Sequence, residues 1–342
     1  MMKLLKRFFG QWKTRHKDPV DEPDPVDEPD PVVVATGGDV EATTEGSAPV
    51  LINATVSPAT DLPTLPSIDP ADYDVVYNGL TITDGITLAD GTDNVLIRDC
   101  TISDATASGI YIGQCDNVVV YNNLVDGCAN AGITTDTGTS STGLVIWKNT
   151  VTNVGHNGIS VWQRWNETPP VDHPDALVYD NDVGITGTSG TLAVREGYHG
   201  IYVQSTNCTV WGNRLIGEVG GNGISIRSSG LVRDNFVKVT TQRVNNGAQI
   251  KYYPDHKTGV DKQLVIKNNF TELVGSGTEM EWGVDLSYTT NKSTTPVVSD
   301  ADWYVNDFFV QDNDVTCEGT EVRINSTLSA LPFVTITQSG NV

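Results

Sequence analysis

The feature that most restricts the fold of this chain is a polar residue that recurs at one place in a short apolar pattern. Each member of this column has an aliphatic residue three positions before it and an apolar residue two positions after it. The members are Cys100, Asn123, Asn149, Asn181, Asn213, Asn235, Asn268 and Asn313. The shortest spacings between neighbouring members are 22 and 23 residues. Such self-similarity predicts a solenoid, in which each small unit buries its apolar face only against its neighbours.

A second column consists of glycines that open short runs of alternating apolar residues. The glycines are Gly109, Gly132, Gly158, Gly200, Gly223, Gly247 and Gly283. Alternation with a period of two is typical of β-strands and directs one set of side chains inward and the other outward. Three short strands and three turns account for the shortest repeat.

The asparagine column has a physical role in such a stack. An inward amide at a turn can donate and accept hydrogen bonds along the stack, to its counterparts in the coils before and after it. Asparagine also tolerates the left-handed backbone that a tight turn requires. We therefore expect a buried ladder of asparagine side chains that begins at Cys100.

This pattern resembles the right-handed parallel β-helix of the pectin-lyase-like superfamily. That group includes polysaccharide lyases, glycoside hydrolases, epimerases and phage tailspikes. The resemblance covers residues 75–325 and rests on coil periodicity, so it is specific for the fold and weak for function. It implies an all-β, single-stranded parallel β-helix of about eight coils. The leucine-rich-repeat horseshoe competes but is disfavoured, because the inward residues are Val and Ile and no Leu-x-x-Leu-x-Leu frame occurs.

Composition excludes several functional classes. The chain of 342 residues has a formal net charge of −22, which should repel nucleic acid and bare anionic membranes. Its 5 cysteines are an odd number without a Cys-x-x-Cys pair, so we expect buried free thiols and neither a disulfide framework nor a zinc site. No acid-rich cluster suggests calcium, and we predict no tightly bound metal and no cofactor. Neither a membrane-spanning stretch nor a secretory signal is recognisable.

The first 17 residues form a basic segment with no acidic residue. Its bulky apolar residues fall on one face of a helix, and they are Leu4, Leu5, Phe8, Phe9 and Trp12. We predict that residues 1–17 are a docking peptide that folds onto a large assembly or lies on a membrane surface. The alternative is a disordered tail with an accidental pattern.

Residues 18–34 repeat the hexapeptide Asp-Pro-Val-Asp-Glu-Pro. Its regularly placed prolines and self-repelling acids predict an extended tether. Residues 35–74 are rich in Thr, Ser, Pro and Gly and are expected to be a lead-in segment. The predicted order is therefore docking peptide, tether, lead-in segment and a β-helix over residues 75–342.

The candidate site lies at the outward positions two and four residues after each column glycine. The first set is Tyr111, Thr134, Ser160, Tyr202, Ser225, Gln249 and Asp285. The second set is Gly113, Asp136, Trp162, Gln204, Arg227, Lys251 and Ser287. Adjacent coils lie ~4.8 Å apart. The side chains of four successive coils should therefore form a row about 15 Å long; they are Trp162, Gln204, Arg227 and Lys251. That is the length of a trisaccharide or tetrasaccharide.

The resemblance implies a ligand groove along the outward face of one sheet. The candidate carbohydrate-binding residues are Tyr111, Asp136, Trp162, Trp165, Tyr202, Gln204, Arg227, Gln249, Lys251 and Asp285. Aromatic rings could stack on sugars, and the two cations could clamp a carboxylate or sulfate. The alternative is an ordinary solvated sheet face.

Catalytic candidates follow from the resemblance to lyases, which implies Lys251 as a base and Arg227 as the group that neutralises a uronate carboxylate. The alternative is two surface cations. Hydrolysis needs two close carboxylates, whereas Asp136 and Asp285 should lie ~24 Å apart. Tyr198-His199-Gly200 is similar to the Gly-His-Gly of polygalacturonases, but the accompanying motifs are absent, so His199 is interpreted as a turn residue.

These features predict a virion surface protein that resembles a phage tailspike. Its N-terminal peptide would attach to the particle, and its β-helix, as a homotrimer, would bind host-surface polysaccharide, with degradation of that polysaccharide left open. An exported, extracellular lyase acting on uronate-containing glycans is the first alternative. A purely structural spike is the second.

Overall fold

The computed structural model describes residues 63–342, apart from 137, 139, 165–170, 242–246, 255–261, 273–279, 288–304, 317–321 and 331–333. The predicted docking peptide and tether, most of the lead-in segment and Trp165 lie outside these described residues. Thr55–Val342 belongs to one compact unit.

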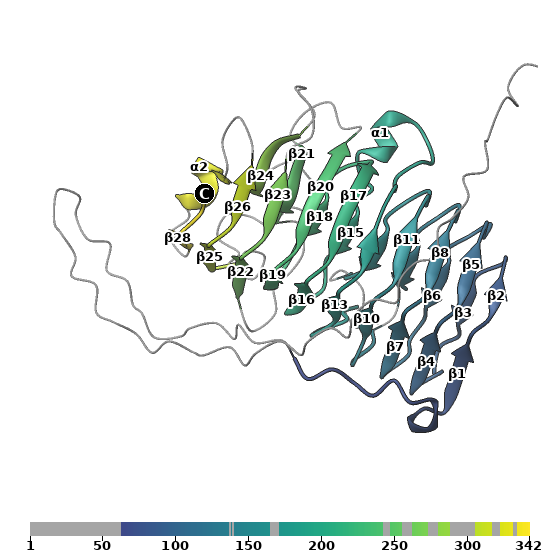
Figure 1. The fold of residues 1–342 in the computed structure, drawn as a ribbon. Coiled ribbons are helices and arrows are strands. Elements are labelled where there is room, and N and C mark those ends of the chain that lie inside the picture. Colours follow the sequence, from purple (N-terminus) through teal and green to yellow (C-terminus); the bar gives the residue numbers. More distant parts are fainter. Residues whose placement is uncertain are drawn as a thin grey trace, which may run out of the picture. The chain divides into compact units, whose positions relative to one another are not determined.

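The described residues form three parallel sheets, in which each strand pairs with the strand three places later in the chain (Figure 1). The 10-stranded first sheet contains β1 (Val75–Asn78), β4 (Val95–Arg98), β7 (Val118–Tyr121), β10 (Val145–Trp147), β13 (Leu177–Tyr179), β16 (Cys208–Trp211), β19 (Gly230–Arg233), β22 (Gln263–Lys267), β25 (Asp307–Gln311) and β28 (Thr335–Ser339). The 9-stranded second sheet contains β2 (Thr81–Ile82), β5 (Thr101–Ser103), β8 (Leu124–Asp126), β11 (Thr150–Thr152), β14 (Asp182–Val183), β17 (Arg214–Val219), β20 (Phe236–Thr241), β23 (Phe270–Glu272) and β26 (Asp314–Thr316). The 9-stranded third sheet contains β3 (Ile86–Leu88), β6 (Ile110–Ile112), β9 (Ile133–Thr135), β12 (Ile159–Val161), β15 (Ile201–Val203), β18 (Ile224–Ile226), β21 (Gly247–Tyr252), β24 (Met280–Leu286) and β27 (Val322–Ile324). One coil is therefore three strands, one from each sheet, as the repeat length predicted.

Short helical turns interrupt this pattern: η1 (Pro70–Asp72), α1 (Leu192–Arg195) and α2 (Ser326–Ser329). The coils also extend past the eight that the asparagine column marks, since β1 to β3 precede Cys100 and β28 follows Asn313. No helix among the described residues is long and apolar enough to cross a membrane.

The core is built from aliphatic side chains that stack directly on one another from coil to coil. One such column in the first sheet is Ile97, Val120, Ile146, Val178, Val210, Val232, Ile266 and Val310. Each of these side chains is buried. The predicted alternation of inward and outward residues thus has the expected effect, because no single coil could remove these groups from water.

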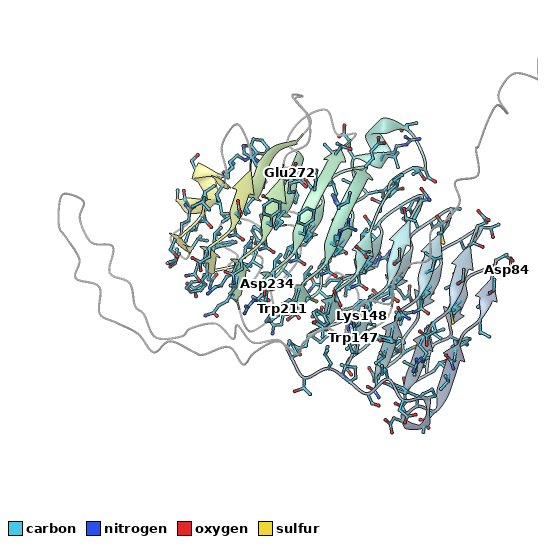
Figure 2. All side chains as sticks on the ribbon, viewed as in Figure 1. Asp84, Trp147, Lys148, Trp211, Asp234 and Glu272 are labelled. Carbon is cyan, nitrogen blue, oxygen red and sulfur yellow. The ribbon has the colours of Figure 1, made fainter. Side chains whose placement is uncertain are left out.

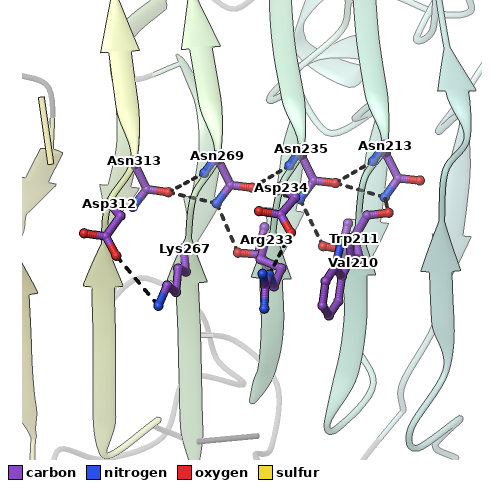
Figure 3. Close-up of polar contacts among 11 residues, drawn as sticks. Val210, Trp211, Asn213, Arg233, Asp234, Asn235, Lys267, Asn269, Asp312 and Asn313 are labelled. Atoms are coloured by element: carbon purple, nitrogen blue, oxygen red, sulfur yellow. Dashed lines mark hydrogen bonds and ion pairs between the residues drawn. The ribbon is translucent and has the colours of Figure 1, made fainter. Parts of the chain in front are cut away.

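The buried amide ladder exists and is longer than predicted. Its members are Asn123, Asn149, Asn181, Asn213, Asn235, Asn269, Asn313 and Asn341. Each side-chain amide donates to the Oδ1 atom of the next asparagine at 2.9–3.0 Å (Figure 3). That Oδ1 also accepts the backbone N–H of the preceding asparagine. The backbone N–H and the side-chain amide of one asparagine thus share the Oδ1 atom of the next as their acceptor. Cys100 begins the ladder through its backbone N–H, as expected.

The placement of Asn268 in this column was wrong by one residue. Asn268 has a φ of 53° and is exposed, whereas the next residue, Asn269, is buried and carries the ladder bonds. The position before each ladder asparagine is left-handed throughout, for example at Asp234 and Asp312. The turn therefore divides the two roles that the sequence analysis gave to one asparagine: one residue bends the backbone and the next bonds along the stack.

The glycine column is explained by close packing rather than by backbone conformation. A Cβ added at Gly158 would lie 2.7 Å from Val183 Cγ1 and 2.6 Å from the carbonyl oxygen of Gly200. A Cβ added at Gly132 would collide with Val151 in the same way, and one added at Gly223 would collide with Val237. The chain enters the third sheet so close to the next coil that no side chain fits.

Gly247 was wrongly placed in this column, because Ile224 pairs with Ile250 and so aligns Gln249 with Gly223. The Gln249 side chain is fully buried and bonds to backbone atoms of Val239, accepting at 3.1 Å and donating at 2.9 Å. An amide can occupy this position because it finds backbone partners that an aliphatic group would not.

The thiols of Cys100, Cys115, Cys128 and Cys208 are free and buried, as predicted. Burial raises the pKa of Cys128 to about 11 and that of Cys208 well above its ordinary value, so these thiols are unreactive at neutral pH. Cys317 lies outside the described residues.

Candidate functional site

Two outward columns of the third sheet bring the candidate residues together. The first is Tyr111, Thr134, Ser160, Tyr202, Ser225, Lys251, Asp285 and Arg323. The second continues through backbone hydrogen bonds between coils and contains Asp136, Gln204, Arg227, Tyr253, Ser287 and Asn325, with Trp162 in the coil before Gln204. The predicted row of Trp162, Gln204, Arg227 and Lys251 is therefore wrong in its last member, whose place is taken by Tyr253. Gln249 does not belong to the outward face at all.

The outward face of the third sheet is largely buried, although Tyr111, Asp136, Trp162 and Tyr253 remain partly exposed, so it is not an ordinary solvated surface. Ser160 and Ser225 are 0% exposed and Arg227 is 9% exposed. Outward residues of the second sheet, such as Thr150 and Asp182, are exposed. A sheet face that removes hydroxyl and guanidinium groups from water must supply them with polar partners, and this one does.

Aromatic rings surround Arg227 at the centre of this face. The guanidinium carbon lies 5.0 Å from the ring centre of Tyr202 and 4.7 Å from that of Tyr253. Tyr202 meets Trp162 edge to face at 5.4 Å and accepts a hydrogen bond from Gln204 Nε2 at 2.6 Å. Cation–π contacts with two rings stabilise the Arg227 side chain in this position.

A hydroxyl network occupies the neighbouring coils. Trp162 Nε1 donates to Thr134 Oγ1 at 2.9 Å, and Ser160 Oγ donates to the same oxygen at 2.8 Å. The Tyr111 hydroxyl donates to Asp136 Oδ1. Burial, followed by this bond to the carboxylate, raises the pKa of Tyr111 to about 12. Tyr111 therefore stays protonated at neutral pH and acts as a hydrogen-bond donor.

Lys251 lies in a buried ion network rather than beside Arg227. Its Nζ atom is 3.0 Å from Asp285 Oδ2, and the two side chains are 4% and 0% exposed. Arg323 binds both Asp285 oxygens at 2.7 Å, and Ser287 Oγ donates to Oδ2 at 2.7 Å. The carboxylate stabilises the charged ammonium, whereas a general base must be neutral. This arrangement opposes the predicted role of Lys251 as a base.

His199 belongs to a second, shorter ladder that the sequence analysis missed. Asn157 Oδ1 accepts the backbone N–H of His199 at 2.7 Å, and His199 Nδ1 accepts the backbone N–H of Asn222 at 2.9 Å. Asn222 Oδ1 accepts the backbone N–H of Ala248 at 3.1 Å. These three polar residues each directly precede a column glycine: Gly158, Gly200 or Gly223. This shared position is the sequence pattern that could have predicted the second ladder.

The outer side of the first sheet carries an aromatic column that was also missed. It consists of Tyr121, Trp147, Tyr179 and Trp211, each two residues before a ladder asparagine; Trp147 and Trp211 are labelled in Figure 2. The rings contact one another, with centres 4.7 Å apart for Tyr121 and Trp147 and 6.0 Å for Trp147 and Tyr179. Arg233 covers Trp211 at 4.1 Å. The Tyr121 and Trp147 rings meet edge to face and the Trp147 and Tyr179 rings are stacked, so this column joins neighbouring coils.

The described residues contain no group of three or more His, Cys, Asp or Glu side chains placed to hold a metal ion. What the third sheet offers is a largely buried polar face with hydrogen-bond donors, three ring-bound or ion-paired cations and several aromatic groups. Its partly exposed members, Tyr111, Asp136, Trp162 and Tyr253, are aromatic and polar groups of the kind that recognition of a polyhydroxylated ligand requires.

Comparisons with known proteins agree with this architecture. Residues 73–169 match a family described as right-handed beta helix region. The A-module of a mannuronan C-5 epimerase from Azotobacter vinelandii superposes with a TM-score of 0.51 at 14% identity, covering 73% of this chain and 58% of the module. A surface adhesin of Streptococcus pneumoniae superposes with a TM-score of 0.46 at 12% identity, covering 79% of this chain and 68% of the adhesin. The chain thus spans a little over half the length of the epimerase module. No curated protein sequence matches it. The chain is a right-handed parallel β-helix, the fold that its resemblance to the pectin-lyase-like superfamily predicted.

Proposed function

We propose that this chain binds a polysaccharide on the outward face of the third sheet and is displayed on a virion surface through residues 1–17. The observation that carries the binding proposal is the pair of partly exposed rings, Trp162 and Tyr253, that contact the Tyr202 and Arg227 cluster on the polar face. Sugars need both apolar faces and hydrogen-bond donors, and this face supplies both. The epimerase module with a similar fold acts, by its name, on mannuronan, a polysaccharide.

Matched tryptophan variants test the binding site. Trp162→Ala should lower affinity for the bound polysaccharide about ten-fold or more, because it removes a ring from the face and one of the two donors to Thr134 Oγ1. Trp211→Ala makes the same change on the first sheet and should leave affinity unchanged. Isothermal titration against a panel of bacterial surface polysaccharides, with circular dichroism to confirm folding, measures both. Equal affinities of the two variants would refute the assignment of the face.

Display on a virion is argued from the sequence of the arm alone. A version without residues 1–34 should no longer co-sediment with cell-free particles, and mass photometry of the full chain should count three subunits. A full chain that stays monomeric and free would refute both the display and the trimer.

The second candidate function is catalysis at the same face, which would make the chain a polysaccharide lyase or a glycoside hydrolase. The lyase mechanism would need Lys251 released from Asp285. Ultraviolet absorbance of unsaturated products from uronate-containing polysaccharides tests it directly. Activity that survives in Lys251→Ala would assign the base to another residue.

A further inference from the structure

We infer that residues 55–68 lie along the outward face of the first sheet as an extended strap, by which the chain covers an apolar surface of its own β-helix. Residues 63–68 of this strap belong to the described structure. Residues 55–62 lie outside it but fall within the compact unit Thr55–Val342. The inference concerns the first sheet and is independent of polysaccharide binding on the third.

The first sheet has an apolar outward column, which is unusual for a surface that would face water. Its members are Val76, Leu96, Val119, Val145, Leu177, Thr209, Leu231, Val265 and Phe309. Each alternates with inward residues, as Leu96 does with Val95 and Ile97 of the core cluster. Successive side chains of a strand point to opposite faces, so this column points away from the core.

The outward column is nevertheless buried. Leu96 and Val119 are 0% exposed. Leu177 is 3% exposed and Leu231 is 7% exposed. By contrast, Leu124, an outward leucine of the second sheet, is 41% exposed, so neighbours within a sheet do not by themselves hide such a side chain. Because these exposures are those of one chain, the cover is supplied by the chain itself.

The described part of the strap lies on this side of the first sheet. Arg98, an outward residue of β4, donates from Nη1 to the carbonyl oxygen of Ile68 at 2.7 Å. Ile68 and Leu65 are half-buried, whereas Thr64 and Ser67 are exposed. Leu65 and Ile68, three positions apart, therefore face the protein.

The extent of the cover agrees with this path. Val76 in the first coil is 38% exposed, whereas Leu96 in the second is 0% exposed. Ile68 is bonded in that second coil, just before the chain turns through η1 to enter β1. The connections that enter β4 and β7, residues 89–94 and 113–117, are too short to cover the sheet. Figure 1 shows the described lead-in extending from η1 in the direction of the later coils.

The sequence of the strap has the period of a polyproline II helix. Apolar residues recur at every third position, and they are Val56, Ala59, Leu62, Leu65 and Ile68. Pro58, Pro63 and Pro66 lie between them and favour an extended backbone in themselves and in the residues before them. Polyproline II has about three residues per turn and rises ~3.1 Å per residue, so one face repeats every ~9 Å.

This repeat matches the spacing of the β-helix. Adjacent coils lie ~4.8 Å apart, so two coils span about the same length as one turn of the strap. The distance from Val56 to Ile68 is ~37 Å in polyproline II, and the column from Leu96 to Phe309 is ~34 Å long. Residues 55–68 therefore suffice to cover the whole column.

Aromatic rings border the column on one side. Tyr121, Trp147, Tyr179 and Trp211 lie two strand positions after members of the apolar column. Proline-rich segments dock into grooves lined by such rings, because their preformed helix loses little entropy on binding. A polyproline II backbone also makes no internal hydrogen bonds, so its carbonyl groups can accept from the sheet, as Ile68 does from Arg98.

Two consequences follow for the molecule. The strap runs from the late coils to the first, so Thr55 lies beside the last coils of the first sheet. The apolar column is occupied by the chain itself and is closed to a ligand or a second copy.

Hydroxyl-radical footprinting of the full chain tests the cover directly, because the oxidation rate of a side chain reports its access to water. Leu62 should be oxidised about ten-fold or more slowly in the protein than in a synthetic peptide of residues 50–70, because a packed side chain reacts only when the strap opens. Leu124 is the internal control and should react quickly, whereas Leu231 should be protected. Equal rates for Leu62 in protein and peptide would overturn the inference.

Matched variants of the strap identify what covers the sheet. Leu62→Asp puts a charge on the covered side of the strap and should raise the oxidation rate of Leu231 about five-fold or more. Thr60→Asp adds the same charge outside the period of three and should leave Leu231 protected. The melting temperature should fall in Leu62→Asp alone, and circular dichroism checks that both variants fold. A Leu231 that stays protected in Leu62→Asp would assign the cover to another segment and overturn the inference.

Pulsed electron paramagnetic resonance tests the direction of the strap. Asn78 in β1 and Ser339 in β28 hold the same strand position at the two ends of the first sheet. A nitroxide on Ser57→Cys should lie closer to one on Ser339→Cys than to one on Asn78→Cys. A Cys317→Ser background leaves only the buried native thiols. The reverse order of the two distances would overturn the proposed path.

A second copy of the chain is the other candidate occupant of the column. In that case the oxidation of Leu231 would rise as the protein is diluted, mass photometry would show dissociation, and Leu62 would react as fast as in the peptide. That result would overturn the strap. Protection of Leu231 that does not depend on concentration supports it.

Discussion

At the scale of single residues, the coil is defined by two adjacent positions with different tasks. The left-handed residue, such as Asn268, bends the chain, and the ladder residue, such as Asn269, satisfies buried backbone groups of the neighbouring coils. Aspartate, lysine and glycine also occupy the bending position, whereas the ladder from Asn123 onward uses only asparagine. The reason is that a short side chain with both a donor and an acceptor is needed only at the second position.

Substitution of these two neighbours should therefore have unequal effects. Asn269→Ala leaves the buried Asn235 N–H and its amide without an acceptor, so the free energy of unfolding should fall by about 2–5 kcal/mol. Asn268→Gly keeps the left-handed turn and should change it by less than about 0.5 kcal/mol. Urea denaturation followed by circular dichroism measures both. A larger loss for Asn268→Gly than for Asn269→Ala would mean that Asn268, and not Asn269, belongs to the ladder.

His173 predicts how stability responds to acid. Its Nε2–H donates to the carbonyl oxygen of Asp136 at 3.3 Å, and Nδ1 is buried without a hydrogen-bond partner among the described residues. Burial lowers the pKa of His173, so its contribution to stability is complete above the ordinary histidine pKa and is lost as pH falls below it. The wild type should lose more stability between pH 7 and pH 5 than His173→Gln, which keeps a donor for Asp136. Urea unfolding midpoints of both proteins at the two pH values measure this loss. Midpoints that decrease by the same amount in wild type and His173→Gln would contradict the prediction.

At the scale of elements, the three sheets differ in what they do with their outward faces. The second sheet exposes polar residues to water, and the first joins its coils through stacked rings such as Trp147 and Tyr179. The third buries a polar face, which requires ion pairs and hydroxyl bonds between strands. Strands β21, β24 and β27 show this most clearly, because Lys251, Asp285 and Arg323 lie side by side in register.

Removal of the central carboxylate should weaken these strands. Asp285→Asn removes the carboxylate that pairs with the buried Lys251 ammonium and with Arg323, so the free energy of unfolding should fall by about 3–5 kcal/mol. Asp182→Asn breaks the exposed pair with Arg214, whose side chains are 53% and 61% exposed, and should cost less than about 1 kcal/mol. Chemical denaturation of the two variants compares them directly. Similar costs would show that water reaches the Asp285 network.

At the scale of the whole molecule, stability is approximately a sum over neighbouring coils, because each strand of a coil pairs only with strands of the coils beside it. The charge is not distributed in this local way: 43 acidic and 21 basic residues act on one another over the full chain. Self-repulsion of this kind opposes the compact state and weakens as salt shortens the screening length from ~30 Å at 0.01 M to ~3 Å at 1 M.

The melting temperature should consequently rise when sodium chloride is increased from 0.01 M to 0.5 M. Choline chloride should have the same effect, because ionic strength and not a bound sodium ion is responsible. Scanning calorimetry of the full chain measures both series. A melting temperature that stays constant or falls would mean that local ion pairs outweigh the net charge.

The sequence by itself determined the repeat, the parallel β-helix, the aliphatic core and the existence of an amide ladder, because these follow from periodicity that every coil repeats. Individual turns were less certain where two candidates were adjacent, as at Asn268 and Asn269, since only the alignment of Ile266 with Val310 selects between them. Loops of unequal length hid the register of the third sheet, so Gln249 and Lys251 were displaced by two residues.

Only the tertiary structure decided what the candidate face contains. The ion pair of Lys251 with Asp285 and the rings around Arg227 join residues that are 34 and about 25 positions apart, and no local pattern specifies such pairs. The partner of His199 Nδ1 is likewise a backbone N–H in the next coil. Chemistry on a solenoid face arises from neighbours in adjacent coils, and stacking, not sequence distance, chooses those neighbours.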